Sequence, residues 1–349
     1  MNAAIDNSHN DIDLDRLQAY LCARIPGFVG PIEILRFPGG QSNPTYKLTA
    51  PSGVYVMRSK PASAARLLPS AHAIEREYRL QSALAGSAVP VAPMYCLCED
   101  ESIIGRAFYV MAFVEGRILW EQSLPGLSAD ARGAIYDEMN RVIAALHAVD
   151  PATVGLADYG KAGNFFARQI DRWTRQYRAS QTGTITAMEQ LIEWLPQHIP
   201  VEETPQVAIV HGDFRLDNLI FHPSEPRVLA VIDWELSTLG HPLADFAYHV
   251  MSWHIPPAQF RGLGGLDLAV LGIPAEADYV ATYLRRTGLT MAGDWNFYLA
   301  YNLFRSAGIL QGIAKRVQDG TAAGAQAEAI GRGAQPLAEL GWQFVQRVR

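Results

Sequence analysis

Residues 207–235 read VAIVHGDFRLDNLIFHPSEPRVLAVIDWE. An apolar run opens this stretch at Val207–Val210, and a second follows at Val228–Ile232. Short apolar runs bounded by turn-forming residues are typical of buried strands. Because both runs end in polar loops, the pattern predicts that three side chains are carried toward one place: Asp213, Asn218 and Asp233.

The residue types in these loops indicate phosphoryl transfer. Oxygen-bearing side chains suit Mg²⁺, which keeps several waters and takes few protein ligands. A separate carboxylate beside the metal can accept a proton from an attacking hydroxyl. Phosphoryl transfer uses this division of labour, so we assign Asp213 as the base and Asn218 and Asp233 as metal ligands. The alternative is the polar rim of a hairpin, built from turn-forming Asp and Asn.

Arg215 lies between the expected base and the first expected metal ligand. It could neutralise developing phosphate charge or bind an acidic substrate. A purely structural salt bridge is the alternative. His211 is expected to pack beneath the loop and to hydrogen-bond the backbone, and Glu235 to add a metal contact or to support one.

The motif HGDFRLDN followed by IDWE resembles the aminoglycoside phosphotransferase and choline kinase family, a branch of the protein-kinase-like fold. The resemblance covers residues 30–345. The longer strings HGDFRLDNLIFHP and VIDWELSTLGHPLADFAY are most similar to the kinase-like domain fused to some acyl-CoA dehydrogenases. The resemblance implies an α+β fold with a small antiparallel-sheet N-lobe and a large, mostly helical C-lobe. It also implies ATP and Mg²⁺ as cofactors, and Asp245 as an anchor of the catalytic loop.

The chain is long enough for two lobes, with 349 residues of which 49% are hydrophobic. We expect a disordered lead over 1–12, a nucleotide-binding lobe over 13–114 and a helical catalytic and substrate lobe over 115–349. Apolar periodicity and capping residues predict these helices: 13–25, 70–84, one beginning at Ser128, 164–180, 184–195, 276–287, 293–317 and 322–347. The glycine-rich stretch LGGLDLAVLG before residue 276 is expected to be a loop.

The alternating stretch IEILRFPGGQSNPTYKLTAPSGVYVMRSKP predicts a meander of short antiparallel strands. Its first turn, PGGQSN, could hold phosphates with the backbone N–H groups of Gly39 and Gly40 and with Ser42. The alternative is an ordinary turn. No GxxxxGK[ST] motif occurs, which argues against a P-loop enzyme.

The third strand of this meander should present a cation to the nucleotide phosphates. Kinases use a Lys that pairs with a helix Glu. The aligned residue here is Arg58, although Lys60 lies on the same strand face and stays a candidate. The register of REYRLQSAL favours Glu77 over Glu75 as the partner of Arg58.

The strand within AFYVMAFVEGRIL leads, in the resembled fold, into the hinge between lobes. Backbone groups of Met111 through Phe113 are expected to contact adenine, with a buried strand that binds no ligand as the alternative.

Composition narrows the class of partner. The net charge of −6 and the pI near 5.9 argue against a nucleic-acid groove. Three cysteines fit a reducing cytoplasm, and the polar N-terminus does not resemble a signal peptide. No uninterrupted apolar segment of the sequence reaches the length of a membrane span, so we expect no membrane partner. We expect a small-molecule hydroxyl substrate, with a hydroxyacyl-CoA, 4-hydroxyacyl-CoA above all, implied by the resemblance. Alternatives are an aminoglycoside or amino-alcohol kinase and a nucleotide-binding regulatory module without turnover.

Overall fold

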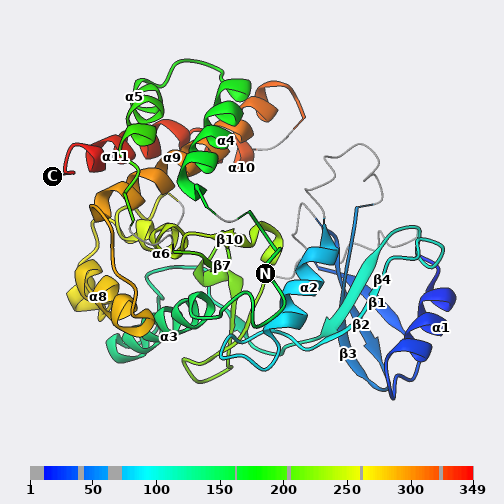
Figure 1. The fold of residues 1–349 in the computed structure, drawn as a ribbon. Coiled ribbons are helices and arrows are strands. Elements are labelled where there is room, and N and C mark those ends of the chain that lie inside the picture. The colour runs from blue at the N-terminus through cyan, green and yellow to red at the C-terminus, as the bar shows by residue number, and fades with distance from the viewer. Residues whose placement is uncertain are drawn as a thin grey trace. The chain divides into compact units, whose positions relative to one another are not determined.

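The computed structural model describes residues 12–37, 43–61, 73–161, 163–202, 206–259, 262–321 and 325–348. The chain forms two compact units (Figure 1). Unit 1 consists of Met1–Arg117, Val154–Leu156 and Leu219–Ser237, and unit 2 of Ile118–Thr153, Ala157–Asn218 and Thr238–Arg349. Unit 1 therefore includes the segment around Asp233, which the sequence analysis assigns to the larger lobe.

Unit 1 is built on an antiparallel five-stranded sheet in the order β1-β2-β3-β5-β4. The strands are β1 (Glu33–Arg36), β2 (Thr45–Ala50), β3 (Gly53–Ser59), β4 (Met94–Cys98) and β5 (Phe108–Ala112). The helices are α1 (Leu14–Arg24), which begins at the N-cap Asp13, and α2 (Ile74–Leu84). The predicted meander is confirmed by β1, β2 and β3, and the predicted helix over 13–25 by α1.

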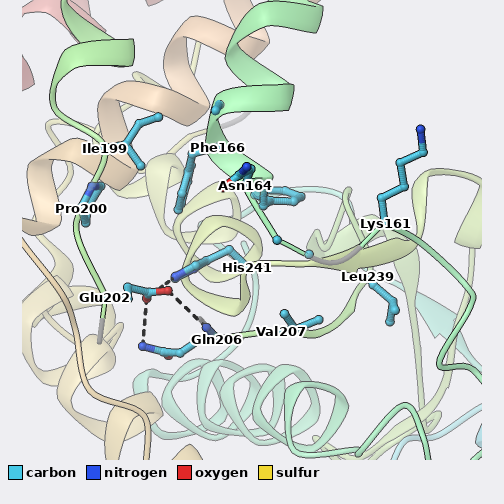
Figure 2. A pocket seen from close by; sticks show the side chains of 14 residues that line it. Lys161, Asn164, Phe166, Ile199, Pro200, Glu202, Gln206, Val207, Leu239 and His241 are labelled. Atoms are coloured by element: carbon cyan, nitrogen blue, oxygen red, sulfur yellow. Dashed lines mark hydrogen bonds and ion pairs between the residues drawn. The ribbon is translucent and has the colours of Figure 1, made fainter. Parts of the chain in front are cut away.

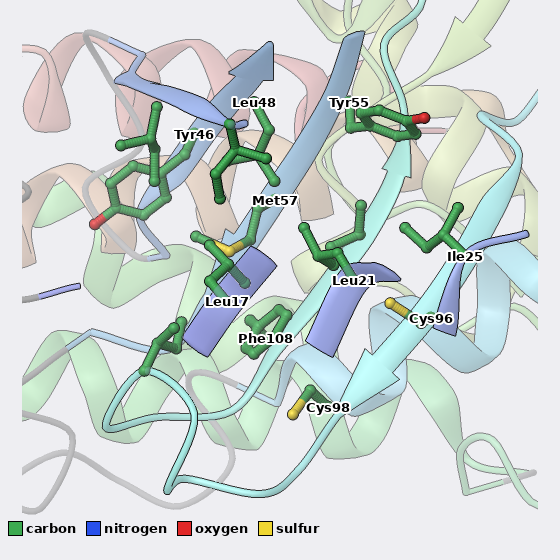
Figure 3. Close-up of a cluster of buried hydrophobic side chains, with 14 of the residues drawn as sticks. Leu17, Leu21, Ile25, Tyr46, Leu48, Tyr55, Met57, Cys96, Cys98 and Phe108 are labelled. Carbon is green, nitrogen blue, oxygen red and sulfur yellow. The ribbon is translucent and has the colours of Figure 1, made fainter. Parts of the chain in front are cut away.

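The two helices of unit 1 pack on opposite faces of this sheet, because side chains alternate along a strand. In β5, Phe108 and Val110 join the cluster that contains Leu17 and Leu21 of α1 (Figure 3). Tyr109, between them, joins a second cluster with Ile74 of α2. Cys96 and Cys98 are buried in the first cluster.

A three-stranded sheet in the order β6-β8-β9 follows later in the chain. Its strands are β6 (Arg117–Ile118), β8 (Leu219–Phe221) and β9 (Val228–Val231). Strands β8 and β9 pair in antiparallel fashion, so the turn between them, which contains Pro223 and Pro226, closes a hairpin that delivers the chain to Asp233.

Unit 2 is mostly helical. Its helices are α3 (Ala129–His147), α4 (Phe165–Ser180), α5 (Thr186–Trp194), α6 (Pro242–Val250), α7 (Leu268–Leu271), α8 (Glu276–Thr287), α9 (Trp295–Gln318), α10 (Ala325–Gly331) and α11 (Ala334–Val345). A two-stranded antiparallel sheet pairs β7 (Ala208–Val210) with β10 (Thr238–Gly240). The long helix α9 packs against α4, α6, α10 and α11, and its buried residues form much of the core. No helix among the described residues is long and apolar enough to span a bilayer.

Two helix predictions differ from the structure. The single helix expected over 322–347 is wrong, because α10 ends at Gly331 and α11 begins at Ala334. A Cβ built at Gly331 would lie 2.9 Å from the Cα of Ala314, so this glycine allows α10 to approach α9 closely before the chain turns. The loop expected at LGGLDLAVLG contains the short helix α7, capped by Asp267 and ended by Gly272 at φ 72°.

The packing of α1 can be tested by truncating Leu21, which is fully buried. We expect Leu21→Ala to lower the free energy of unfolding by about 2–5 kcal/mol, because the lost contacts leave a cavity. The neighbouring Cys22 is exposed on the same helix, so Cys22→Ala should change it by less than about 0.5 kcal/mol. Urea unfolding followed by circular dichroism measures both, and equal midpoints for the two variants would contradict the packing described.

Candidate active site

The loop after β7 is held by one buried carboxylate. Asp245, in the first turn of α6, accepts the backbone N–H of His211 at 2.7 Å and that of Gly212 at 2.8 Å. His211 is fully buried, and its Nδ1 accepts the N–H of Asp213 at 3.2 Å. Both expectations are therefore confirmed: Asp245 anchors the loop and His211 supports its backbone. Hydrogen bonds from three consecutive backbone N–H groups therefore fix the direction in which Asp213 leaves the strand.

Asp245 keeps its negative charge in the core because it is surrounded by donors. Burial raises its pKa, but the hydrogen bond and charge of His147 and the bonds from His211 outweigh burial and lower it below the ordinary value. His147 Nε2 lies 3.1 Å from Asp245 Oδ2, and its Nδ1 lies 2.7 Å from the Tyr283 hydroxyl. This pair joins α3, α6 and α8 beneath the loop.

Asp213 is the centre of a compact polar group within unit 2. The Asn218 amide donates to the Asp213 carbonyl at 2.8 Å and to its Oδ2 at 3.2 Å. Arg215 Nε lies 3.1 Å from Asp213 Oδ1, and Arg215 Nη2 lies 3.3 Å from Asp217 Oδ2. The Tyr248 hydroxyl also donates to Asp213 Oδ1. The structure thus brings together the predicted base, Arg215 and Asn218.

Arg305 reaches the same loop from α9. Its Nη2 donates to the carbonyl of Gly212 at 2.6 Å. Its guanidinium carbon lies 4.9 Å from the ring centre of Tyr248 and 5.7 Å from that of Trp173. Cations stacked on aromatic rings at these distances are attracted by the ring quadrupole.

In unit 1, the sheet register brings Arg58 to α2. Met57 faces the α1 cluster, so Arg58, the next residue of β3, faces the other side, where α2 packs. Arg58 Nε lies 3.2 Å from Glu77 Oε2, which confirms the predicted pairing of these two residues. Lys60 faces the same side and pairs instead with Glu75.

Arg58 also contacts the segment that follows β9. Its Nη2 lies 3.2 Å from Asp233 Oδ1 and 3.1 Å from Glu235 Oε2. One guanidinium therefore meets three carboxylates, one from α2 and two from the IDWE motif. We call Arg58, Glu77, Asp233 and Glu235 the arginine cluster.

Glu77 is the buried member of the arginine cluster, 3% exposed. Burial raises the pKa of Glu77 to about 7, although Arg58 and the hydroxyl of Tyr109 act in the opposite direction. Its oxygens accept from the Asn43 amide at 3.1 Å and from the Tyr109 hydroxyl at 3.1 Å. Glu77 is thus fixed from three sides and in turn fixes Arg58.

Asp233 adopts an uncommon backbone conformation. Its φ of 65° and ψ of 59° lie in the left-handed region, which only a few per cent of non-glycine residues occupy. The buried Trp234 donates its indole N–H to the carbonyl of Val231 at 2.9 Å and so closes the turn. Backbone strain of this kind gathers at functional sites when the surrounding structure enforces it.

The remaining expected nucleotide residues lie elsewhere in unit 1. Met111 is within β5, paired with Val56 of β3 and Met94 of β4. Phe113 follows β5, and its N–H donates to the carbonyl of Val54 at 3.4 Å. Gly39, Gly40 and Ser42 lie outside the described residues.

The donor chemistry of the expected metal ligands fits a hard cation. The Asn218 side chain binds Asp213 through its Nδ2, so these two bonds do not use its amide oxygen. Asp233 keeps 37% of its side chain exposed while Oδ1 contacts Arg58. An amide oxygen and a partly exposed carboxylate are ligands that Mg²⁺ accepts. The described residues contain no group of three His, Cys, Asp or Glu side chains arranged around a metal.

A separate cavity of about 230 Å³ lies within unit 2 (Figure 2). Phe166, Ile199 and Pro200 contribute apolar walls. His241 Nε2 lies 2.7 Å from Glu202 Oε1 at the polar end, and burial lowers the pKa of His241 although Glu202 acts to raise it. His241 also caps α6 by accepting the N–H of Leu243.

Sequence reasoning missed two residues that this site uses, Tyr248 and His147. Tyr248 is three residues from Asp245 on α6, a spacing that places both on one helix face and was available as a signal. His147 is 98 residues from Asp245, and no local pattern reports such a contact.

Comparison with known proteins places these observations in a family. Residues 33–291 match the phosphotransferase enzyme family. The chain is 47% identical over 336 residues to acyl-CoA dehydrogenase family member 10 of Mus musculus, covering 95% of this chain and 31% of that protein. It is 39% identical over 340 residues to acyl-CoA dehydrogenase family member 11 of Homo sapiens, covering 96% of this chain and 43% of that protein. The chain thus spans less than half the length of these curated relatives.

Solved structures agree with this result. A candidate aminoglycoside phosphotransferase from Ralstonia eutropha JMP134 is 61% identical with a TM-score of 0.91, covering 97% of this chain and 99% of that one. A thermostable mutant of aminoglycoside phosphotransferase APH(4)-Ia, in ternary complex with ADP and hygromycin B, has a TM-score of 0.61 at 16% identity, covering 94% and 98%. The protein-kinase-like α+β fold predicted from the sequence is confirmed. The chain therefore belongs to the phosphotransferase enzyme family.

Proposed function

We propose that the protein is an ATP-dependent small-molecule kinase that transfers the γ-phosphoryl group to a substrate hydroxyl. The arrangement around Asp213 carries this proposal, because the loop is anchored by Asp245 while Arg215 and Asn218 contact its carboxylate. A carboxylate held by its backbone and flanked by a metal-ligand candidate is what an in-line phosphoryl transfer requires.

In the proposed reaction Asp213 accepts the proton of the acceptor hydroxyl as its oxygen attacks the γ-phosphorus. The bond between the γ-phosphorus and the β–γ bridging oxygen breaks, and ADP leaves with that electron pair. Asn218 and Asp233 would hold Mg²⁺, which when bound neutralises charge on the phosphate oxygens. Arg215, 3.1 Å from Asp213 Oδ1, would add positive charge beside the reacting group.

On the nucleotide side, Arg58 would bind phosphate while Glu77 holds it. Arg58 is 12% exposed and already meets three carboxylates, so it is the better candidate than Lys60. Gly39, Gly40 and Ser42 would add contacts from the PGGQSN turn. Backbone groups of Met111 through Phe113 would contact adenine, although the N–H of Phe113 already donates to the carbonyl of Val54.

For the acceptor we propose a hydroxyacyl-CoA, in agreement with the names of the two acyl-CoA dehydrogenase relatives. Arg215 and Arg305 both contact the Asp213 loop, and cations there favour an anionic acceptor over a cationic aminoglycoside. A γ-phosphate transfer assay on hydroxyacyl-CoAs, with 4-hydroxyacyl-CoA first, and on aminoglycosides decides between them. Transfer to no acceptor, with ATP still bound, would favour the non-catalytic nucleotide-binding module.

Replacing the proposed base tests the chemistry directly. We expect Asp213→Ala to lower kcat by at least about 100-fold, because the acceptor proton loses its destination, while ATP binding in the presence of Mg²⁺ stays nearly unchanged. Asp171 is 63% exposed and pairs with Arg175 on α4, so Asp171→Ala is the matched control and should keep wild-type kcat. Near-wild-type turnover by Asp213→Ala would refute the assignment of the base.

The raised pKa of Glu77 makes the arginine cluster sensitive to pH. The pKa of Glu77 is about 7 in the folded protein and 4.5 in a model peptide, so folding favours the protonated carboxyl. The stability that this preference adds is complete below about pH 4.5 and is lost as the pH rises through 7. Glu77→Gln does not titrate. Its melting temperature relative to the wild type should therefore rise between pH 5 and pH 8, by the equivalent of up to about 3 kcal/mol. Differential scanning calorimetry measures this, and a constant difference across the range would contradict it.

A further inference from the structure

We propose that Tyr248 is a positioning residue for Asp213, and that Arg305 holds Tyr248 in place for this role. The inference rests on the proposed function, because it concerns how the base of that reaction is oriented. It adds a hydroxyl donor and a stacked cation that the HGDFRLDN and IDWE motifs do not contain.

The geometry around the carboxylate is asymmetric. Oδ1 of Asp213 accepts the Tyr248 hydroxyl and lies 3.1 Å from Arg215 Nε. Oδ2 accepts a hydrogen bond from the Asn218 amide at 3.2 Å. A carboxylate with one oxygen doubly engaged can rotate little about its Cβ–Cγ bond, because rotation would break both contacts. Tyr248 therefore fixes Oδ2 as the oxygen that faces the acceptor.

The same helix holds both the loop and the carboxylate. Within α6, Asp245 binds the backbone of His211 and Gly212, and Tyr248 one turn later binds the side chain of Asp213. Helix α6 therefore holds both the backbone and the side chain of the base. Sites built on helices in this way are held more closely than sites on loops alone.

Arg305 holds the ring of Tyr248 by stacking on its face. Its guanidinium stacks 4.9 Å from the Tyr248 ring centre and donates to the Gly212 carbonyl at 2.6 Å. The guanidinium carbon also lies 5.7 Å from the ring centre of Trp173, so Arg305 contacts two aromatic rings. Because Arg305 touches both the loop residue before Asp213 and the ring that contacts Asp213, movement of one is coupled to movement of the other.

The test is a kinetic comparison of Tyr248→Phe with the wild type, with 4-hydroxyacyl-CoA as the acceptor. Phenylalanine keeps the ring over Arg305 and removes only the hydroxyl. We expect kcat to fall about 10- to 100-fold with the KM for ATP unchanged, because misorientation of the base affects the chemical step. Tyr136→Phe is the matched control, since Tyr136 of α3 also has a buried hydroxyl, but that hydroxyl donates to the Gln122 carbonyl at 2.7 Å and not to Asp213. It should keep wild-type kcat.

A double-mutant cycle separates positioning from general damage. If Tyr248 acts only through Asp213, Tyr248→Phe should have no further effect in an Asp213→Asn background under single-turnover conditions. An equal loss in both backgrounds would overturn the inference, as would an unchanged kcat for Tyr248→Phe. Arg305→Lys keeps the charge but not the planar stack, and it should lower kcat in the same direction.

The outcomes distinguish the two proposals. A wild-type chain that transfers phosphate to no acceptor of the panel refutes the proposed function and this inference with it. A wild-type chain that transfers phosphate and depends on Asp213, while Tyr248→Phe is as active as the wild type, refutes the inference alone.

Discussion

The loop that carries the candidate base depends on the buried negative charge of Asp245. A buried carboxylate is costly unless donors surround it, and here two backbone N–H groups and His147 serve as those donors. The same two N–H groups would otherwise be buried donors without partners. Charge and backbone therefore satisfy each other, and the loop conformation follows from that mutual requirement together with the hydrogen bond to the His211 side chain.

In the arginine cluster of unit 1, by contrast, the carboxylates are not matched by an equal number of positive groups. A single guanidinium meets Glu77, Asp233 and Glu235, so the negative charges outnumber the positive one. A divalent cation bound at Asp233 would correct this excess, and the phosphates that accompany the cation would compete for Arg58 in turn. The cluster thus has a reason to rearrange when a nucleotide binds, which a simple Arg–Glu pair would lack.

Sequence patterns predicted the elements and side-chain pairs that depend on residues close together in the chain. The strands β1, β2 and β3 follow from alternation, and the pairing of Arg58 with Glu77 from helical register. The Asp245 anchor was instead implied by the resemblance to a known family. Tyr248 was not identified, because HPLADFAYHV is apolar enough to indicate only a buried helix. Arg305 and His147 contribute through contacts that close only when distant helices pack. The division of α10 from α11 was visible in Gly331 and Gly333, but its cause, the close approach to Ala314, is tertiary.

The left-handed backbone of Asp233 affects how this position should be probed. Alanine tolerates that conformation poorly, whereas asparagine and glycine adopt it readily. Alanine scanning would therefore mix two effects at residue 233, the missing carboxylate and a relaxed turn that shifts Trp234. Asparagine removes the negative charge while keeping the turn, so it is the substitution that isolates electrostatics from conformation at this position.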